Sequence, residues 1–483
     1  MKIHIIGGGL AGCEAAWQAA SLDVPVVIHE MRPVRPTAVH KTDGLAELVC
    51  SNSFRGDKLD NAVGLLKEEM RRMGSVVMRA ADLSRVPAGA ALAVDRVRFS
   101  EIVTREISSH PLITLVREEM TAVPEGLPGP LIIATGPLTS DPLSRDIARL
   151  VGANHLYFYD AISPIVLAES IDMTKVFRAS RWGRSLGTLN RDSHTEGGHS
   201  TLSVPDQCGV DDGDGDYLNC PMTADEYARF HDAVMSAEKA PLHEFDQAKF
   251  FEGCLPIEVM AARGVDTLRY GPMKPVGLPD PRTGREPYAV VQLRQDNLAG
   301  DHYSLVGFQT QMKWGAQAEV LRLIPGLEQA EFVRFGMIHR NTYINGPTVL
   351  RDTWQMNGQE DLFFAGQVSG VEGYVESAAS GLMAGRNAAA RLLRQPLRVP
   401  PRTTALGALA HYVSHANPHN YQPTNITFGI IAPIDDRSMP RVRGADGRKM
   451  TRKESRKLLL SDRALADLDR WTAEGESRVE ATT

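Results

Sequence analysis

The apolar positions of the first thirty residues follow the order strand, turn, helix, strand. The run Lys2–Ile6 predicts a buried strand, and the small residues of Ala11–Ala20 predict a helix that lies close to a sheet. A second apolar run, Val24–His29, predicts the next strand and ends at Glu30. This order is typical of the first half of a nucleotide-binding α/β unit.

The turn between the first strand and the helix contains the glycines of a G-x-G-x-x-G motif. Gly7, Gly9 and Gly12 fit that spacing, and Glu30 follows the last of them by eighteen residues. One glycine makes the turn, one lets the backbone approach a pyrophosphate, and one allows close helix–strand packing. The helix N-terminus then faces the anion, and the acid accepts hydrogen bonds from ribose hydroxyls. The pattern predicts a dinucleotide site.

Two later segments repeat this logic. "PLIIATGP" (Pro130–Pro137) is an apolar strand that ends in Ala-Thr-Gly, and Leu362–Ala365 is a strand followed by a glycine-rich turn, Gly366–Gly373, and a helix to about Leu393. With the first motif they resemble the cofactor segments of FAD-containing flavoproteins of the two-dinucleotide-binding-domain type. In such proteins the third segment points a helix N-terminus at the flavin, which stabilises negative charge on the reduced ring.

The long interval between these segments predicts an insertion. From about Tyr159 the composition shifts, and "EPYAVVQLRQD" alternates like a strand. We therefore expect an α/β fold: an FAD-binding Rossmann-like domain, 1–160 and 301–435, interrupted by a mixed α/β insertion domain, 161–300, that meets the substrate. A basic C-terminal extension, 436–483, follows, and its "RKESRKLLLSDRALADLDRW" favours an amphipathic helix.

Composition narrows the class of protein without naming a function. With 43% hydrophobic and 23% charged residues over 483 positions, the chain is typical of a globular protein of two to three domains. It contains no apolar run long enough to span a bilayer and begins with a strand in place of a signal peptide, so we expect a cytoplasmic protein without a membrane partner. The net charge of −6 gives no global signature of nucleic-acid binding.

The charge is uneven, however. Between Asp436 and Lys457 there are nine Lys and Arg residues against three acids. Such a run is either a solvated tail or a contact with phosphates, because clustered cations gain affinity by releasing counterions.

Five scattered cysteines, none spaced as CxxC, argue against a disulfide framework, a zinc ribbon or a thioredoxin-like redox pair, and we predict no metal site. One of them, Cys50, lies in "LAELVCSNSFRG", close after the nucleotide motif. Its neighbours Asn52 and Arg55 are residues that lower a thiol pKa. A second, Cys220, lies in "YLNCPM", which we interpret as a turn of the insertion domain. By itself each cysteine is either a buried structural residue or a reactive thiol.

Several long blocks resemble one family. "GGGLAGCEAAWQ", "HEMRP", "LAELVCSNSFR", "FEGCLPIEVMA", "DTLRYGPMKPVGL", "LVGFQTQMKWG", "RFGMIHRNTYIN" and "FFAGQVSGVEGYVESAASGLMAG" are similar to blocks of the folate- and FAD-dependent tRNA uracil-5-methyltransferases. The resemblance covers roughly residues 1–430, and the tail after about Arg437 looks peculiar to this sequence. It implies an enzyme that makes 5-methyluridine at position 54 of the tRNA T-loop. The carbon would come from 5,10-methylenetetrahydrofolate, and FAD, reduced by NADPH or NADH, would supply reducing equivalents.

The resemblance also implies site residues. Cys50 and Cys220 match the two cysteines that the family uses near the flavin, and we expect Cys220 to attack uracil C6 and Cys50 to act as the base or to handle the carbon, although the two roles are exchangeable. His339, Arg340 and Asn341 are the expected folate ligands, because a pterin needs a stacking partner and hydrogen-bond donors. The expected FAD ligands are Gly7, Gly8, Gly9, Leu10, Ala11, Gly12, Glu30, Arg32, Thr135, Gly136, Gly366, Gln367, Gly373 and Tyr374.

Other interpretations of the sequence stay open. Arg178, Arg181 and Arg184 with Trp182 form either an RNA-facing patch or ordinary surface charge. The related glucose-inhibited division protein A family, which modifies the tRNA wobble uridine, shares the flavin fold but is longer, with a helical C-terminal region. A non-catalytic, FAD-containing RNA-binding protein would have no need of the two cysteines.

Overall fold

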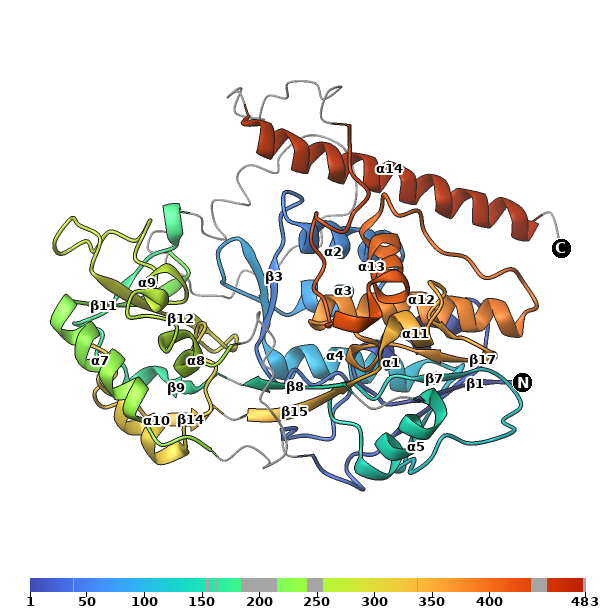
Figure 1. Cartoon of the computed structure of the whole chain (residues 1–483), viewed down its shortest axis with the longest axis horizontal. Helices are drawn as coiled ribbons and strands as arrows, with labels where there is room; N and C mark the ends of the chain where they lie inside the picture. The colour runs from blue at the N-terminus through green and yellow to red at the C-terminus, as the bar shows by residue number, and fades with distance from the viewer. Residues whose placement is uncertain are drawn as a thin grey trace.

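The computed structural model describes residues 1–37, 39–152, 156–161, 163–183, 215–240, 255–336, 338–435 and 450–480. For 156–161, 338–342, 420 and 476–480 it describes the backbone alone. Figure 1 shows two units side by side, with a long C-terminal helix lying across the top of one of them.

The first unit is built on a largely parallel sheet of six strands. Their order is β16-β17-β7-β1-β2-β6, and β1 pairs in parallel with β2 on one side and with β7 on the other. The strands are β1 (Ile3–Ile6), β2 (Val26–Glu30), β6 (Ile113–Arg117), β7 (Leu131–Ile133), β16 (Gln355–Met356) and β17 (Gln359–Phe364). The chain runs outward from β1 to β6 and then returns to the other side of β1. The carboxyl ends of β1 and its neighbours therefore meet at a topological switch point, where such sheets bind nucleotides.

Two helices pack together against this sheet. Helix α1 (Leu10–Ala20) follows β1, and α12 (Tyr374–Leu392) follows β17. Their contact is close because Gly381 and Gly385 of α12 lie against α1. A Cβ at Gly381 would stand 2.2 Å from the carbonyl oxygen of Ala11, and one at Gly385 would stand 2.3 Å from that of Ala15. The predicted strands and helices of all three cofactor segments are thus confirmed within a few residues.

A smaller layer covers the loop that contains Cys50. It consists of α2 (Ala62–Arg72), α3 (Val76–Leu83), α4 (Arg96–Ser109) and a three-stranded sheet of β3 (Ser53–Gly56), β5 (Ala91–Val94) and β4 (Arg85–Val86). Ser53 pairs with Ala93, so the loop leads directly into β3. The remaining helices of this unit are α5 (Asp141–Val151), α11 (Gly346–Val349) and α13 (Ala405–His415).

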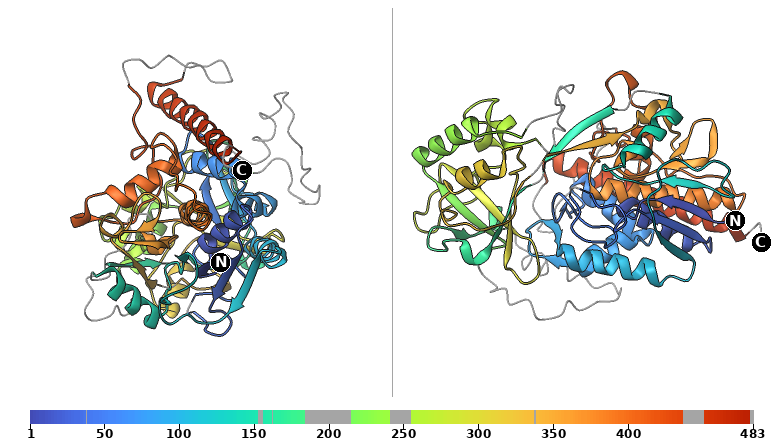
Figure 2. Two further views of the ribbon diagram at one scale, coloured as in Figure 1. Left: turned by 90° about the vertical axis from the view of Figure 1, so that its right-hand side faces the viewer. Right: turned by 90° about the horizontal axis from the view of Figure 1, so that it is seen from below.

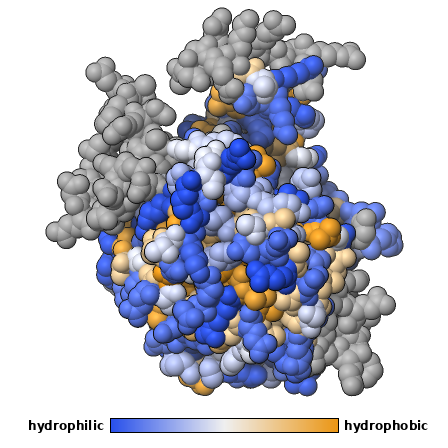
Figure 3. Space-filling model, turned by 90° about the vertical axis from the view of Figure 1, so that its left-hand side faces the viewer, coloured by the Kyte–Doolittle hydropathy of each residue, from blue (hydrophilic) through white to orange (hydrophobic). Residues whose placement is uncertain are grey.

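The second unit has its own six-stranded sheet, in the order β10-β11-β12-β13-β9-β14. Its strands are β9 (Ile165–Leu167), β10 (Phe177–Arg178), β11 (Tyr217–Met222), β12 (Ala289–Gln295), β13 (His302–Leu305) and β14 (Phe332–Arg334). The α-helices among its described residues are α7 (Ala224–Ser236), α8 (Ile257–Ala261), α9 (Thr267–Tyr270) and α10 (Trp314–Leu321). Figure 3 shows this end of the molecule: hydrophilic residues cover most of the face, and apolar residues form small patches between them.

A two-stranded ribbon links the units. Strand β8 (Leu156–Ala161) leads into the second unit and β15 (Ile338–Tyr343) leads back, and the two pair in an antiparallel manner. In Figure 1 and in the right-hand view of Figure 2 the ribbon starts at the boundary between the two units and runs along the first unit. The expected division at residue 300 falls inside the second sheet, since β13 and β14 follow it. The domain boundaries stay a prediction, and the strand order favours moving this one to about 337.

Helix α14 (Arg452–Glu480) confirms the helix predicted near the C-terminus. Leu460, Ala464, Leu465 and Leu468 of this helix are buried in the core of the first unit. Ser461 donates a hydrogen bond to the carbonyl of Leu59 at 2.6 Å. The helix is therefore packed against the FAD-binding unit. No helix in the described part of the chain is long and apolar enough to cross a membrane.

Candidate active site

A cavity of about 400 Å³ opens at the carboxyl ends of β1, β2, β7 and β17. Its lining includes most of the residues that the sequence predicts for cofactor binding: Gly7, Gly9, Leu10, Ala11, Glu30, Arg32, Thr135, Gly136, Gly366, Gln367, Gly373 and Tyr374. Gly8 and Gly12 are not among its lining residues. Cys50 lines the same cavity. The three cofactor segments and the first candidate thiol are therefore brought together.

The turn after β1 is shaped for close approach to an anion. Gly7 has φ of +109°, and a Cβ there would stand 2.5 Å from the carbonyl oxygen of Ala134. At Gly12 a Cβ would stand 1.9 Å from the carbonyl oxygen of Gly7. Gly9, at the N-cap of α1, makes no side-chain cap, and a Cβ there would meet nothing within 4 Å. Gly9, Leu10 and Ala11 line the cavity, so the first turn of α1 borders it, which fits the pyrophosphate of FAD.

Glu30 lies at the end of β2 with both carboxylate oxygens engaged. Oε2 accepts from the backbone N–H of Gly8 at 2.7 Å, and Oε1 accepts from Nε of Arg32 at 2.8 Å. Burial by itself raises the pKa of Glu30, but the charge and hydrogen bonds of Arg32 outweigh it, and the pKa lies below its usual value. The carboxylate is therefore ionised. Oε1 also accepts from the backbone N–H of Arg32 at 3.0 Å, so Oε2 is the oxygen that keeps a second lone pair to accept from a ribose hydroxyl.

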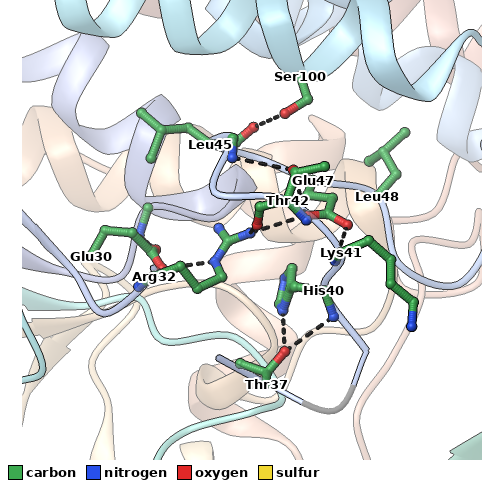
Figure 4. Close-up of polar contacts among 12 residues, drawn as sticks. Glu30, Arg32, Thr37, His40, Lys41, Thr42, Leu45, Glu47, Leu48 and Ser100 are labelled. Atoms are coloured by element: carbon green, nitrogen blue, oxygen red, sulfur yellow. Dashed lines mark hydrogen bonds and ion pairs between the residues drawn. The ribbon is translucent and has the colours of Figure 1, made fainter. Parts of the chain in front are cut away.

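Arg32 links Glu30 to the loop that leads toward Cys50. Its Nη1 donates to Oε2 of Glu47 at 3.2 Å, and Glu47 accepts in turn from the backbone N–H of Lys41 and from the hydroxyl of Thr42, both at 2.8 Å (Figure 4). Arg32 is 4% exposed. The predicted ligand Arg32 thus acts at least in part by ordering this loop.

His40 lines the cavity beside this network, and the sequence analysis missed it. Its Nδ1 lies 2.7 Å from the hydroxyl of Thr37. Burial, followed by the charge of Arg32, lowers the pKa of His40 to about 4, so the ring is neutral at pH 7. No motif marks it, since only the folded loop brings it next to Arg32.

Cys50 is half-buried and is held through its backbone. Its N–H donates to the hydroxyl oxygen of Tyr374 at 2.8 Å, and that of Ser51 donates to the same oxygen at 3.1 Å. Tyr374 is the first residue of α12, and burial raises the pKa of its phenol well above the usual value, so the hydroxyl stays neutral. The N-terminus of the helix expected near the flavin and the Cys50 loop are thus joined directly.

Arg55 and Asn52, the neighbours expected to influence the thiol, have other partners. Arg55 forms an ion pair with the buried Glu376 of α12, and its carbonyl accepts from Nζ of Lys67 at 3.2 Å. Asn52 accepts from Arg294 of the second unit at 2.8 Å. A further cation, Arg334 of β14, interacts electrostatically with Cys50. Burial lowers the pKa of Arg334, and its Nη2 is buried with no hydrogen-bond partner among the residues that the structure describes.

Cys220 lies away from this cavity. It is in strand β11, opposite Val291 of β12, and is fully buried in the core of the second unit. The expectation of a turn was wrong: β11 runs through Pro221, which β10 does not reach, so the missing N–H breaks no bond on that side. Burial, followed by the charge of Glu328, raises the pKa of the Cys220 thiol above its usual value. Its catalytic role stays a prediction.

The predicted folate residues His339, Arg340 and Asn341 stand on β15, on the ribbon between the two units. Their side chains lie outside the described residues, and their role also stays a prediction. Cys208, Cys254 and Arg184 lie outside them as well.

The other cysteine and arginine candidates have structural partners. Cys13 is buried and donates to the carbonyl of Gly8 at 3.3 Å, as expected of a packing residue. Arg181 donates to the carbonyls of Lys274 and Val276 at 2.6 and 2.7 Å, so it orders a loop.

Comparisons with known proteins extend over nearly the whole chain. The family model described as glucose inhibited division protein A matches residues 2–196 and 200–396. A methylenetetrahydrofolate–tRNA-(uracil-5-)-methyltransferase of Anoxybacillus flavithermus is 56% identical over 90% of this chain and 94% of its own length. One of Geobacter sulfurreducens is 53% identical over 98% of this chain and 99% of its own.

A match over 98% of this chain includes most of residues 436–483. The expectation that the tail is peculiar to this sequence was therefore wrong. Within the tail, residues 452–480 form helix α14.

Among solved structures, Aquifex aeolicus GidA in two crystal forms gives TM-scores of 0.65 and 0.64 at 15% and 16% identity, over 99% and 97% of this chain and 76% and 75% of that one. At this identity the likeness shows the fold, that of an FAD-binding α/β flavoprotein. The chain belongs to the glucose inhibited division protein A family and, within it, to the methylenetetrahydrofolate–tRNA-(uracil-5-)-methyltransferases.

Proposed function

We propose that this chain methylates C5 of uridine 54 in the T-loop of tRNA, with 5,10-methylenetetrahydrofolate as the carbon donor and FAD, reduced by NADPH or NADH, as the source of reducing equivalents. One observation carries the proposal: Cys50 lines the same cavity as the three cofactor segments, in a chain of this family. The cavity therefore offers a thiol where the nucleotide site also lies.

The chemistry requires such a thiol because C5 of uracil is a poor nucleophile. When a thiolate forms a bond to C6, the C5–C6 electron pair moves into the C4 carbonyl as an enolate, and C5 becomes nucleophilic. C5 then bonds to the methylene carbon of the donor. A base takes the C5 proton, and that electron pair forms an exocyclic C5=CH2 as the bond from the methylene carbon to the donor nitrogen breaks; the S–C6 bond breaks only when this methylene is reduced. A hydride reduces this group to methyl, and two electrons per methyl group are supplied by reduced FAD when it is bound.

The residues of the cavity fit that cofactor. The N-terminus of α1 suits the pyrophosphate, Glu30 suits the ribose, and the N-terminus of α12, with Tyr374, suits the ring. These residues support a site that would hold the pyrophosphate, a ribose and the flavin ring.

For the two cysteines we propose unequal roles. Cys50 is the thiol that faces the cavity, so we assign it to the reacting centre, as nucleophile, base or carbon handler. Cys220 faces the core of the second unit, and to reach uracil β11 would have to move. Trapping the covalent enzyme–RNA adduct decides which cysteine attacks C6. If the adduct forms with Cys50→Ala but not with Cys220→Ala, the attack belongs to Cys220.

The test is an assay with two donors on a T-loop substrate. Purified protein with FAD and NADPH receives tRNA and either labelled 5,10-methylenetetrahydrofolate or labelled S-adenosylmethionine. We expect label in 5-methyluridine from the folate alone, and NADH in parallel gives the preferred nicotinamide. Label from S-adenosylmethionine alone would contradict the proposal. Label in the anticodon loop would favour a wobble-uridine enzyme of the kind to which the fold is also similar.

A further inference from the structure

Arg294 reaches from the second sheet to the two residues that follow Cys50. Its Nε donates to Oδ1 of Asn52 at 2.8 Å, and its Nη2 donates to the hydroxyl of Ser51 at 2.7 Å. The side chain starts on β12 and lines the cavity, yet the residue is only 9% exposed. Arg294 thus spans the boundary between the two units and binds side chains on both sides of one peptide bond.

Asn52 strengthens the same link. It is fully buried, and its Nδ2 donates to the carbonyl of Gln295, the residue after Arg294, and to that of Val94, both at 3.0 Å. Each polar atom of the Asn52 side chain therefore has a hydrogen-bond partner, and two of these partners, Arg294 and Gln295, lie on β12.

A second arginine ties the start of the same segment to this strand. Arg96 of α4 donates to the carbonyl of Leu48 at 3.1 Å and to Oδ1 of Asp296, also at 3.1 Å. Residues 48–52 are thus connected to three consecutive residues: to Arg294 and Gln295 at the end of β12, and through Arg96 to Asp296, which follows the strand. On the opposite side the phenol of Tyr374 accepts from Cys50 and Ser51. The segment that contains Cys50 is therefore hydrogen-bonded to both units.

The strand that carries Arg294 is also the neighbour of Cys220. Along β12, Val291 and Leu293 point into the core of the second unit, and Arg294 points to the other face, toward the cavity. Cys220 pairs with Val291, three residues before Arg294. A shift of β12 would therefore move both candidate cysteines.

We propose that Arg294 is a positioning residue for Cys50: by binding Ser51 and Asn52 it sets the place of the thiol in the cavity and makes that place depend on how the second sheet lies against the FAD-binding unit. Only the predicted effect on turnover rests on the proposed function. The ordering of residues 50–53 by Arg294 does not depend on which reaction the protein catalyses.

The test measures hydrogen exchange and turnover together in the FAD-loaded protein. Arg294→Ala should increase amide exchange of residues 50–53 at least tenfold, leave the flavin absorbance unchanged, and lower kcat at least tenfold with KM for tRNA within twofold. Arg294→Lys reaches one acceptor and should recover part of both effects. The matched control is Arg282→Ala, because Arg282 also makes several bonds in the second unit, to Asp280 and Thr174, and none to this loop. It should change neither quantity.

Unchanged exchange in Arg294→Ala would overturn the proposal, and so would faster exchange with unchanged kcat. If the wild-type protein methylates no tRNA, the proposed function fails, while exchange still decides whether Arg294 holds the segment. Should Arg294→Ala not fold, Ser51→Ala removes one acceptor and leaves the arginine in place. Because the Ser51 hydroxyl also accepts from the backbone N–H of Ser53 at 3.1 Å, the readout is then the amides of residues 50–52. They should show a smaller increase, and no increase would contradict the role.

Discussion

At the residue scale, the site depends on polar side chains whose partners lie far away in the sequence. Glu30 was predicted because its spacing from the glycine motif carries the chemistry, and Arg32 because the chain resembles the methyltransferase family. Tyr374 was predicted as a cofactor ligand, but its bond to Cys50 joins residues 324 positions apart, and the bond between Arg294 and Asn52 joins residues 242 apart. No local pattern contains such pairs, so only the fold reveals them.

His40 gives a residue-scale prediction for pH. Its pKa is about 4 in the folded protein against an ordinary 6.5, so as the pH falls through this window the unfolded chain takes up the proton first. The histidine therefore stabilises the fold above pH 6.5, and that contribution, about 3 kcal/mol for this shift, is lost as the pH approaches 4. We expect the free energy of unfolding, measured in urea at pH 7 and pH 4.5, to fall by about 2 kcal/mol more in the wild type than in His40→Gln. Equal losses in the two proteins would show that the His40 pKa is not lowered.

At the element scale, the packing of α1 on α12 fixes where both helix N-termini point. The helices themselves could be predicted, since small residues at short spacing favour a close helix contact. That residues 217–222 form a strand could not be predicted, because Pro221 and the short apolar run suggest a turn. Only the pairing with β10 and β12 shows that they form β11. Tertiary pairing overrides local propensity there.

Gly385→Ala tests the helix contact. The added Cβ would stand 2.3 Å from the carbonyl oxygen of Ala15, so the helices must separate. We expect a loss of about 1–3 kcal/mol in the free energy of unfolding and weaker retention of FAD, measured by denaturation and by flavin absorbance after dialysis. Gly315→Ala, in α10, is the control, since a Cβ there meets nothing within 4 Å. A Gly385→Ala protein as stable as the control would contradict the close contact.

At the scale of the whole molecule, the ribbon of β8 and β15 joins two sheets, and α14 is packed on the first unit. Removing the tail would also expose the apolar side chains of the first unit that pack against α14, so a deletion could not separate a loss of stability from a loss of RNA binding. Lys453 and Lys457, near the start of α14, are the better sites for a test of the basic segment.

We expect Lys453→Gln with Lys457→Gln to weaken tRNA binding at low salt and to reduce the slope of log affinity against log salt by up to about 2, because fewer counterions are released. Filter binding between 50 and 200 mM salt measures this slope. The double variant Lys453→Arg with Lys457→Arg keeps both charges and should bind as the wild type does. Unchanged affinity in the glutamine variant would favour a solvated tail.

The central claim is that a thiol in the flavin cavity takes part in methyl transfer to tRNA. The most direct measurement is label from 5,10-methylenetetrahydrofolate in 5-methyluridine, quantified from tRNA digests for the wild type, Cys50→Ala and Cys13→Ala, each with FAD bound. Cys13 is a buried thiol that does not line the cavity, so its loss should leave most of the activity. We expect label in 5-methyluridine from the wild type and from Cys13→Ala, and at least a hundredfold less label from Cys50→Ala. Full labelling by Cys50→Ala would contradict it.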